Sequence, residues 1–119
     1  MEKLELTILS NLIHNEDYSR KVIPFIKLEY FDIRAEEIIC QEIIDFIAKY
    51  NKAITQEILG LEVQNREDIT EQEYKNICDI ISKLDKSETN TNWLVDVTEK
   101  WCRDRAIYLA LMSSIKIAD

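Results

Sequence analysis

The stretch WLVDVTEKWCRDRAIYLALMSSIKIA, residues 93–118, decides the fold because its 26 consecutive residues include no glycine and no proline. It predicts one uninterrupted helix, about 39 Å long at 1.5 Å per residue. A compact domain of 119 residues is only about 35 Å across, so this helix must cross the domain or project from it. Lys116 is the only charged residue between Ala106 and Ala118. A helix that is hydrophobic almost all round is either buried or packed against a partner.

The chain before this stretch also shows helical periodicity. Apolar residues at helical spacing predict a first helix over about 4–13 and a long third helix over about 35–50. A short second helix lies between them and is limited by Pro24. Asp17 and Asp32 are the expected N-caps of the second and third helices, because an aspartate side chain can accept from the first free backbone N–H groups.

Two more helices should begin at threonine caps. Thr55 predicts a short fourth helix, and Thr70 with Glu73 forms a capping box that predicts a fifth. The polar residues 85–92 predict a loop before the last helix. A single glycine in 119 residues argues against β-hairpins, which need positive φ angles. The sequence therefore predicts an all-α fold, a small bundle of about five to six helices that ends in the long one.

The net charge and the small number of reactive side chains argue against several functions. Fifteen Lys and Arg against 23 Asp and Glu give a net charge of −8, which disfavours binding of DNA by this chain. One glycine cannot form a phosphate-binding loop, and His14 alone cannot build a metal site of several histidines. His14 is expected to lie at the C-terminus of a helix, where a positively charged side chain interacts favourably with the helix dipole. Cys40, Cys78 and Cys102 have no paired spacing and are expected to be reduced thiols in the core, as in a cytoplasmic protein. We expect no catalytic, cofactor-binding or metal site in this chain, and no association with a membrane.

Several short segments, in order along the chain, carry a resemblance to a known family. They are Ile8–Ile13 (ILSNLI), Lys21–Pro24 (KVIP), Glu29–Phe31 (EYF), Ile80–Leu84 (IISKL), Asn92–Val95 (NWLV), Thr98–Trp101 (TEKW) and Arg105–Ala106. With these segments the chain resembles the N-terminal region of the DnaB-type hexameric replicative DNA helicases, in the form found in T-even-like phages. The similarity extends over almost the whole chain at near-constant spacing.

The resemblance implies a role in assembly. The N-terminal domains of this family are small helical bundles followed by a helical hairpin, and they form a collar above a ring of motor domains. The collar stabilises the hexamer and receives the primase and, in some members, the helicase loader. The motor domain, which uses ATP and Mg²⁺ and unwinds DNA, follows the collar. On this basis residues 1–92 are expected to be the globular domain and 93–119 the first arm of the hairpin. The motor, the DNA contact and the nucleotide would then belong to the rest of a longer phage protein in the cytoplasm of the bacterial host.

The last helix is the expected contact surface between copies, as a dimer for this chain alone and a hexamer for the whole helicase. The predicted interface residues are Trp101, Ile107, Tyr108, Leu111, Met112 and Ile115. Two other hypotheses are compatible with the sequence. One is the helicase-binding domain of a primase, which has a related helical bundle, and the other is an unrelated helical adaptor.

Overall fold

The computed structural model describes residues 3–118, and within this range every regular element is helical. The all-α prediction is therefore confirmed. Six α-helices and two short 3₁₀ turns follow one another in the order α1 (Leu4–His14), α2 (Glu16–Val22), η1 (Ile23–Phe25), η2 (Leu28–Tyr30), α3 (Arg34–Tyr50), α4 (Gln56–Gln64), α5 (Glu71–Ser82) and α6 (Thr91–Ala118).

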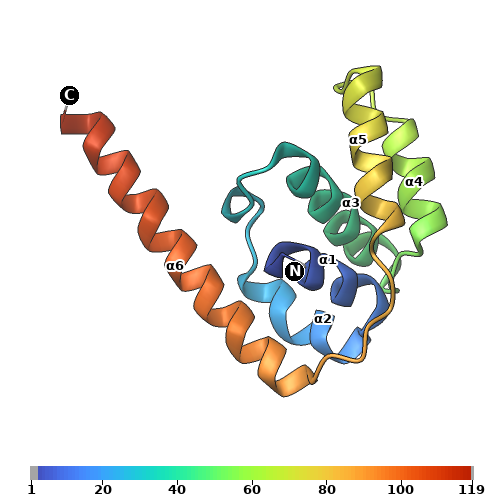
Figure 1. The fold of residues 1–119 in the computed structure, drawn as a ribbon, viewed down its shortest axis with the longest axis horizontal. Coiled ribbons are helices and arrows are strands. Elements are labelled where there is room, and N and C mark those ends of the chain that lie inside the picture. Colours follow the sequence, from blue (N-terminus) through green and yellow to red (C-terminus); the bar gives the residue numbers. More distant parts are fainter. Residues whose placement is uncertain (1–2, 119) are drawn as a thin grey trace.

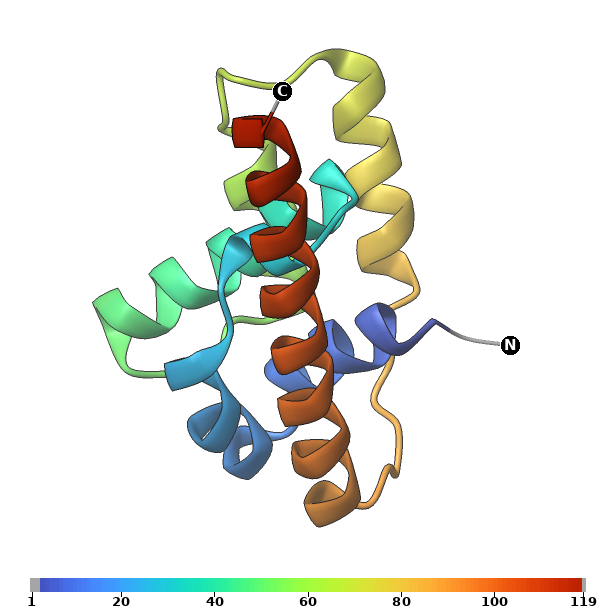
Figure 2. The same ribbon diagram turned by 90° about the vertical axis from the view of Figure 1, so that its left-hand side faces the viewer.

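The helices form a globular body from which α6 projects (Figure 1). At one end of the body α3, α4 and α5 pack against one another, and α1 connects this group to α2 through contacts with both α3 and α2. The first half of α6 lies along α2 and η2, whereas its second half extends away from the body (Figure 1). Seen from the side of α6, the helix runs in front of the other helices (Figure 2). Twenty-eight residues span about 42 Å, close to the longest dimension of the molecule, 45 Å. Of the two arrangements expected for this helix, the structure has the projecting one.

One continuous hydrophobic core holds the body together. Every helix contributes to it, and α6 does so through Leu94 and Cys102. The largest fully buried apolar side chains are Ile8, Leu9, Leu12, Tyr18, Ile39, Ile43, Ile54, Leu59, Ile77, Leu84 and Leu94. The buried core residues of α6 lie in its first half, and beyond them Leu109 is partly buried against the core, whereas residues 110–116 are exposed.

Two predicted helix starts are confirmed in detail. The Thr55 hydroxyl accepts from the backbone N–H of Ile58 at 3.1 Å and caps α4. Thr70 and Glu73 form the complete capping box of α5, with distances of 3.1 and 2.9 Å. Both caps depend on residues three apart, which is why the sequence alone reveals them.

Three other helix starts differ from the prediction. The side chain of Asn15, not Asp17, caps α2 by accepting from Tyr18 N, so the turn after α1 is a single residue. Asp32 does not cap α3, because Ile33 takes the N-cap position in extended conformation and has no capping side chain. Helix α6 begins at Thr91, two residues earlier than predicted, because Asn90 Oδ1 accepts from the backbone N–H of Trp93 at 2.9 Å.

No helix within residues 3–118 combines the length and the apolar composition needed to cross a membrane.

Candidate interaction surface on helix α6

The first half of α6 is held in the body by one face. Leu94, Thr98 and Cys102 follow one another at intervals of four residues and are all buried. Thr98 is polar, but its hydroxyl forms a 2.6 Å hydrogen bond with the hydroxyl of Tyr18 on α2. Both groups are inside the core, so neither keeps an unsatisfied hydroxyl there. This part of α6 therefore has a defined position against α2.

Trp101 is the one predicted interface residue that packs mainly within its own chain. Its ring meets Tyr30 edge-on, with centroids 6.1 Å apart, and lies 5.0 Å from the ring of Phe31. Edge-to-face aromatic pairs of this kind contribute about 0.5–1.5 kcal/mol beyond the area they bury. The sequence predicted that Trp101 contacts another copy; in the structure its side chain is half-buried against the turn η2 and the residue that follows it.

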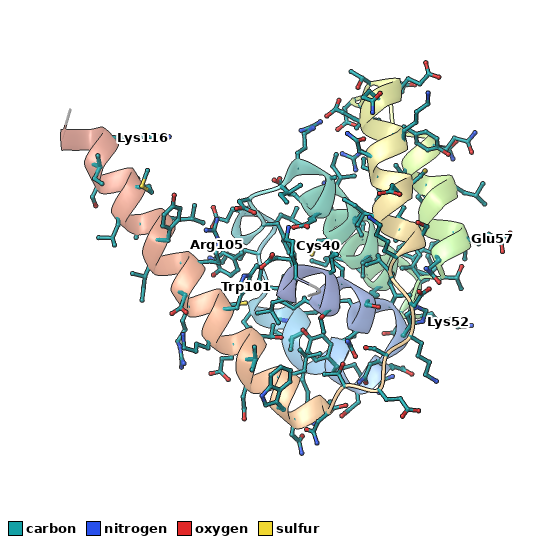
Figure 3. The ribbon with its side chains drawn as sticks, in the orientation of Figure 1. Cys40, Lys52, Glu57, Trp101, Arg105 and Lys116 are labelled. Carbon is teal, nitrogen blue, oxygen red and sulfur yellow. The ribbon has the colours of Figure 1, made fainter. Side chains whose placement is uncertain are left out.

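Arg105 makes the polar contact that joins this half of α6 to the turn η2. Its Nε donates to the carbonyl oxygen of Tyr30 at 2.7 Å, and its guanidinium lies 4.9 Å from the ring centre of Tyr108. Trp101 and Arg105 lie on the side of α6 that faces the body, whereas Lys116 lies near the projecting end (Figure 3). Arg105 thus marks the boundary between the anchored and the projecting halves of the helix.

The other predicted interface residues lie together on the projecting half. Their side chains are between 38% and 60% exposed, which is unusual for large apolar groups this close in sequence. We call this set the apolar face of α6: Ile107, Tyr108, Leu111, Met112 and Ile115. Its residues recur at intervals of three and four, so they occupy one side of the helix. A surface of this kind is suited to pack against another protein.

A groove beside the anchored half of α6 was not predicted from the sequence. It has a volume of about 380 Å³ and is lined by Phe25 from η1, Tyr30 from η2, and Glu99, Cys102, Arg103 and Ala106 from α6. Phe25 and Tyr30 come from two separate 3₁₀ turns, which show no periodic signal in the sequence. Only the packing of these turns on α6 brings the lining residues together.

The cysteines and His14 lie at separate places in the described part of the chain. Burial raises the pKa of the Cys40 thiol to about 12 and that of Cys102 to about 11, so both stay protonated at neutral pH. Cys78 is only half-buried, against the prediction of a core position, because it lies at the edge of the buried face of α5. His14 is the last residue of α1 as predicted, and its Nε2 donates to the carbonyl oxygen of Leu84 at 2.8 Å. Among the residues that the structure describes, no group of three or more potential ligands could hold a metal ion.

Comparison with known proteins agrees with the family named from the sequence. No family model matches the chain. A DnaB-like replicative helicase of Enterobacteria phage T4 is 33% identical over 110 residues. The alignment covers 92% of this chain but 23% of the T4 protein, so the chain spans about a quarter of the length of its relative. Over nearly its whole length, this chain is similar to a DnaB-like replicative helicase.

Proposed function

We propose that this chain is the collar domain of a DnaB-like replicative helicase and acts by protein contacts, promoting hexamer assembly and receiving the primase. The relationship to the T4 helicase supports a role in DNA replication and favours this hypothesis over a primase domain or an unrelated adaptor. In this proposal the motor, with its ATP and Mg²⁺, lies in another part of the same protein and unwinds the DNA there.

The exposed apolar face of α6 is the observation that carries the proposal. Leu111 and Ile107 are each 60% exposed, although a leucine or isoleucine gains about 1.5–3 kcal/mol when it is fully buried. In an assembly these side chains would be covered by another copy. One helix face buries little area for an interface, so we expect weak association that begins with a dimer and becomes stable when a ring holds the copies together.

Replacement of Leu111 by aspartate tests this proposal. Leu111→Asp introduces a charge that would have to be buried without a partner in the interface, so association should be lost. The matched control is Leu61→Asp on α4, where the same substitution falls on a residue of similar exposure, 54%. Helix α4 lies on the opposite side of the body from α6 (Figure 1). Sedimentation velocity from about 5 to 500 µM should show association of the wild type and Leu61→Asp and a monomer for Leu111→Asp. A wild-type monomer at every concentration, or normal association of Leu111→Asp, would contradict self-association through this face.

The contact with primase is proposed from the relationship to the helicase family. Calorimetric titration of the chain into the primase of the same replication system measures it directly. Heat of binding that persists in Leu111→Asp would place the primase contact away from the apolar face. A titration without heat at several temperatures would speak against this part of the proposal.

A further inference from the structure

The negative charge of the chain is uneven in space although it is even along the sequence. Residues 1–60 and residues 61–119 each carry −4. In the fold, however, residues 34–82 form the group of α3, α4 and α5 and hold eleven Asp and Glu against five Lys and Arg, which is −6 of the total of −8. Helix α6, on the side of the body opposite α4 (Figure 1), carries +1. The end of the body made by α3, α4 and α5 is therefore the part that attracts a cationic partner.

A small pocket lies between α3 and α4 at this end of the body. It has a volume of about 90 Å³ and is lined by Glu42, Asp45, Phe46, Lys49 and Tyr50 from α3 and by Glu62 from α4. Sites for drug-sized ligands measure about 300–1,000 Å³, so this pocket suits the end of a single side chain. The residues from α3 recur at intervals of three and four, which places them on one face of that helix.

Two aromatic rings line the pocket and remain accessible from solvent in part. The rings of Phe46 and Tyr50 have centroids 4.7 Å apart, and Tyr50 is 52% exposed. The ammonium group of Lys49 lies 5.2 Å from the centre of the Tyr50 ring. An aromatic face attracts cations through its negative electrostatic potential. The chain thus already places one cation on this ring, and the ring edge and the second ring are open to another.

Two of the three carboxylates in the pocket have no cationic partner. Glu42 is paired with Arg66 at 2.7 Å. Asp45 and Glu62 are exposed, and neither belongs to an ion pair within residues 3–118. A cationic group that enters the pocket therefore meets two unpaired carboxylates beside a pair of aromatic rings.

We propose that this pocket receives an arginine side chain from a basic segment of another protein. A guanidinium is planar, stacks on aromatic rings and donates two parallel hydrogen bonds to a carboxylate, whereas an ammonium group lacks this planar fork. Free arginine carries a carboxylate of its own, which Glu42, Asp45 and Glu62 repel, so the pocket favours an arginine within a polypeptide. The pocket is formed by α3 and α4, so the inference does not depend on the proposed self-association through α6.

Titration of the ¹⁵N-labelled chain with short capped peptides, followed by NMR, tests this inference. The probe is acetyl-Lys-Leu-Arg-Leu-Lys-amide, and two comparison peptides carry citrulline or lysine in place of the arginine. Citrulline keeps the shape of arginine without its charge, and lysine keeps the charge without the planar fork. The arginine peptide should shift the backbone signals of α3 and α4 around the pocket. It should bind about threefold more tightly than the lysine peptide and about fivefold more tightly than the citrulline peptide.

Substitutions of exposed residues locate the contact on the surface. Glu62→Gln and Tyr50→Ala should each weaken binding of the arginine peptide about fivefold. Glu57→Gln is the matched control, because Glu57 is also an exposed carboxylate on α4 but points away from the body (Figure 3). It is about 140° from Glu62 around the helix axis, and its substitution should change the affinity by less than about twofold. Circular dichroism of each variant checks that the helical content is unchanged.

Three results would contradict this inference. If Glu57→Gln weakens binding as much as Glu62→Gln, the general negative charge of this end holds the peptide, and the pocket does not. Equal binding of the lysine or citrulline peptide would overturn the assignment to arginine. Signal shifts confined to other helices, or no shifts up to about 5 mM peptide, would overturn the pocket itself. Leu111→Asp should bind the arginine peptide like the wild type, so a failure of the proposed self-association would leave this inference intact.

Discussion

The hydrogen bond between Tyr18 and Thr98 allows a quantitative test of how α6 is anchored. Tyr18→Phe removes one hydroxyl and leaves that of Thr98 in the core without this partner. Both residues are fully buried, and the two oxygens are 2.6 Å apart. A buried polar group that loses its partner costs about 1–3 kcal/mol. Thr98→Val should cost a similar amount, because it leaves the hydroxyl of Tyr18 unsatisfied in the same way.

The double variant Tyr18→Phe with Thr98→Val decides whether the loss of this hydrogen bond causes the loss of stability. Replacing both partners by apolar groups of the same shape leaves no unsatisfied hydroxyl, so the double variant should be more stable than either single variant. With an m value of about 2 kcal/mol/M, a loss of about 2 kcal/mol lowers the urea midpoint of a single variant by about 1 M. The midpoint of the double variant should return most of the way to that of the wild type.

Urea unfolding followed by circular dichroism measures all four proteins. Tyr108→Phe is the matched control, since it removes the same hydroxyl from a side chain that is 49% exposed, and its midpoint should not move. If the losses of the two single variants simply add in the double variant, the hydroxyls do not depend on each other. The anchoring of α6 would then rest on apolar packing alone.

Two further predictions concern the α4–α5 region. Thr70→Ala should lower the free energy of unfolding by about 1 kcal/mol, measured by urea unfolding, whereas Thr70→Ser keeps the capping hydroxyl and should lie close to the wild type. Arg66 lowers the pKa of the Asp68 carboxyl below its ordinary value of 3.8, so the stabilising effect of this pair is complete at neutral pH and declines below about pH 4. Asp68→Asn should therefore weaken the loss of stability on acidification, and an unchanged acid limb of thermal stability against pH would contradict this.

The features that the sequence predicted well are local ones. A capping box needs only Thr70 and Glu73, three residues apart, and the long last helix needs only the absence of breakers. The capping error at α2 arose where two polar residues compete. Asn15 and Asp17 are both good caps, and the tertiary position of the turn after α1 selects Asn15, whose side chain also donates to Thr91 at the start of α6. A contact between residues 76 apart leaves no trace in a local pattern.

In the candidate surface, too, local features could be predicted from the sequence and contacts between distant residues could not. The apolar character of this face follows from the low charge of residues 106–118, but the sequence left open whether the helix crosses the domain or projects from it. The position of Trp101 does not follow from the sequence, because on the helix this side chain could face either a partner or its own domain. The rings of Tyr30 and Phe31, far away in sequence, decide between the two. The groove also depends on these turns, so it could be found only from the three-dimensional arrangement.

The anchoring contacts also explain how a projecting helix can serve assembly. A helix that moved freely about its base would lose orientational freedom on binding, and this cost would weaken an interface that is already small. Thr98, Trp101 and Arg105 instead hold the base of α6 on three different groups of the body: the hydroxyl of Tyr18, two aromatic rings and a backbone carbonyl. The helix continues without a glycine or proline beyond this base, so its end keeps the direction set there. The body therefore presents the apolar face in a fixed orientation, as the proposed assembly of identical copies would require.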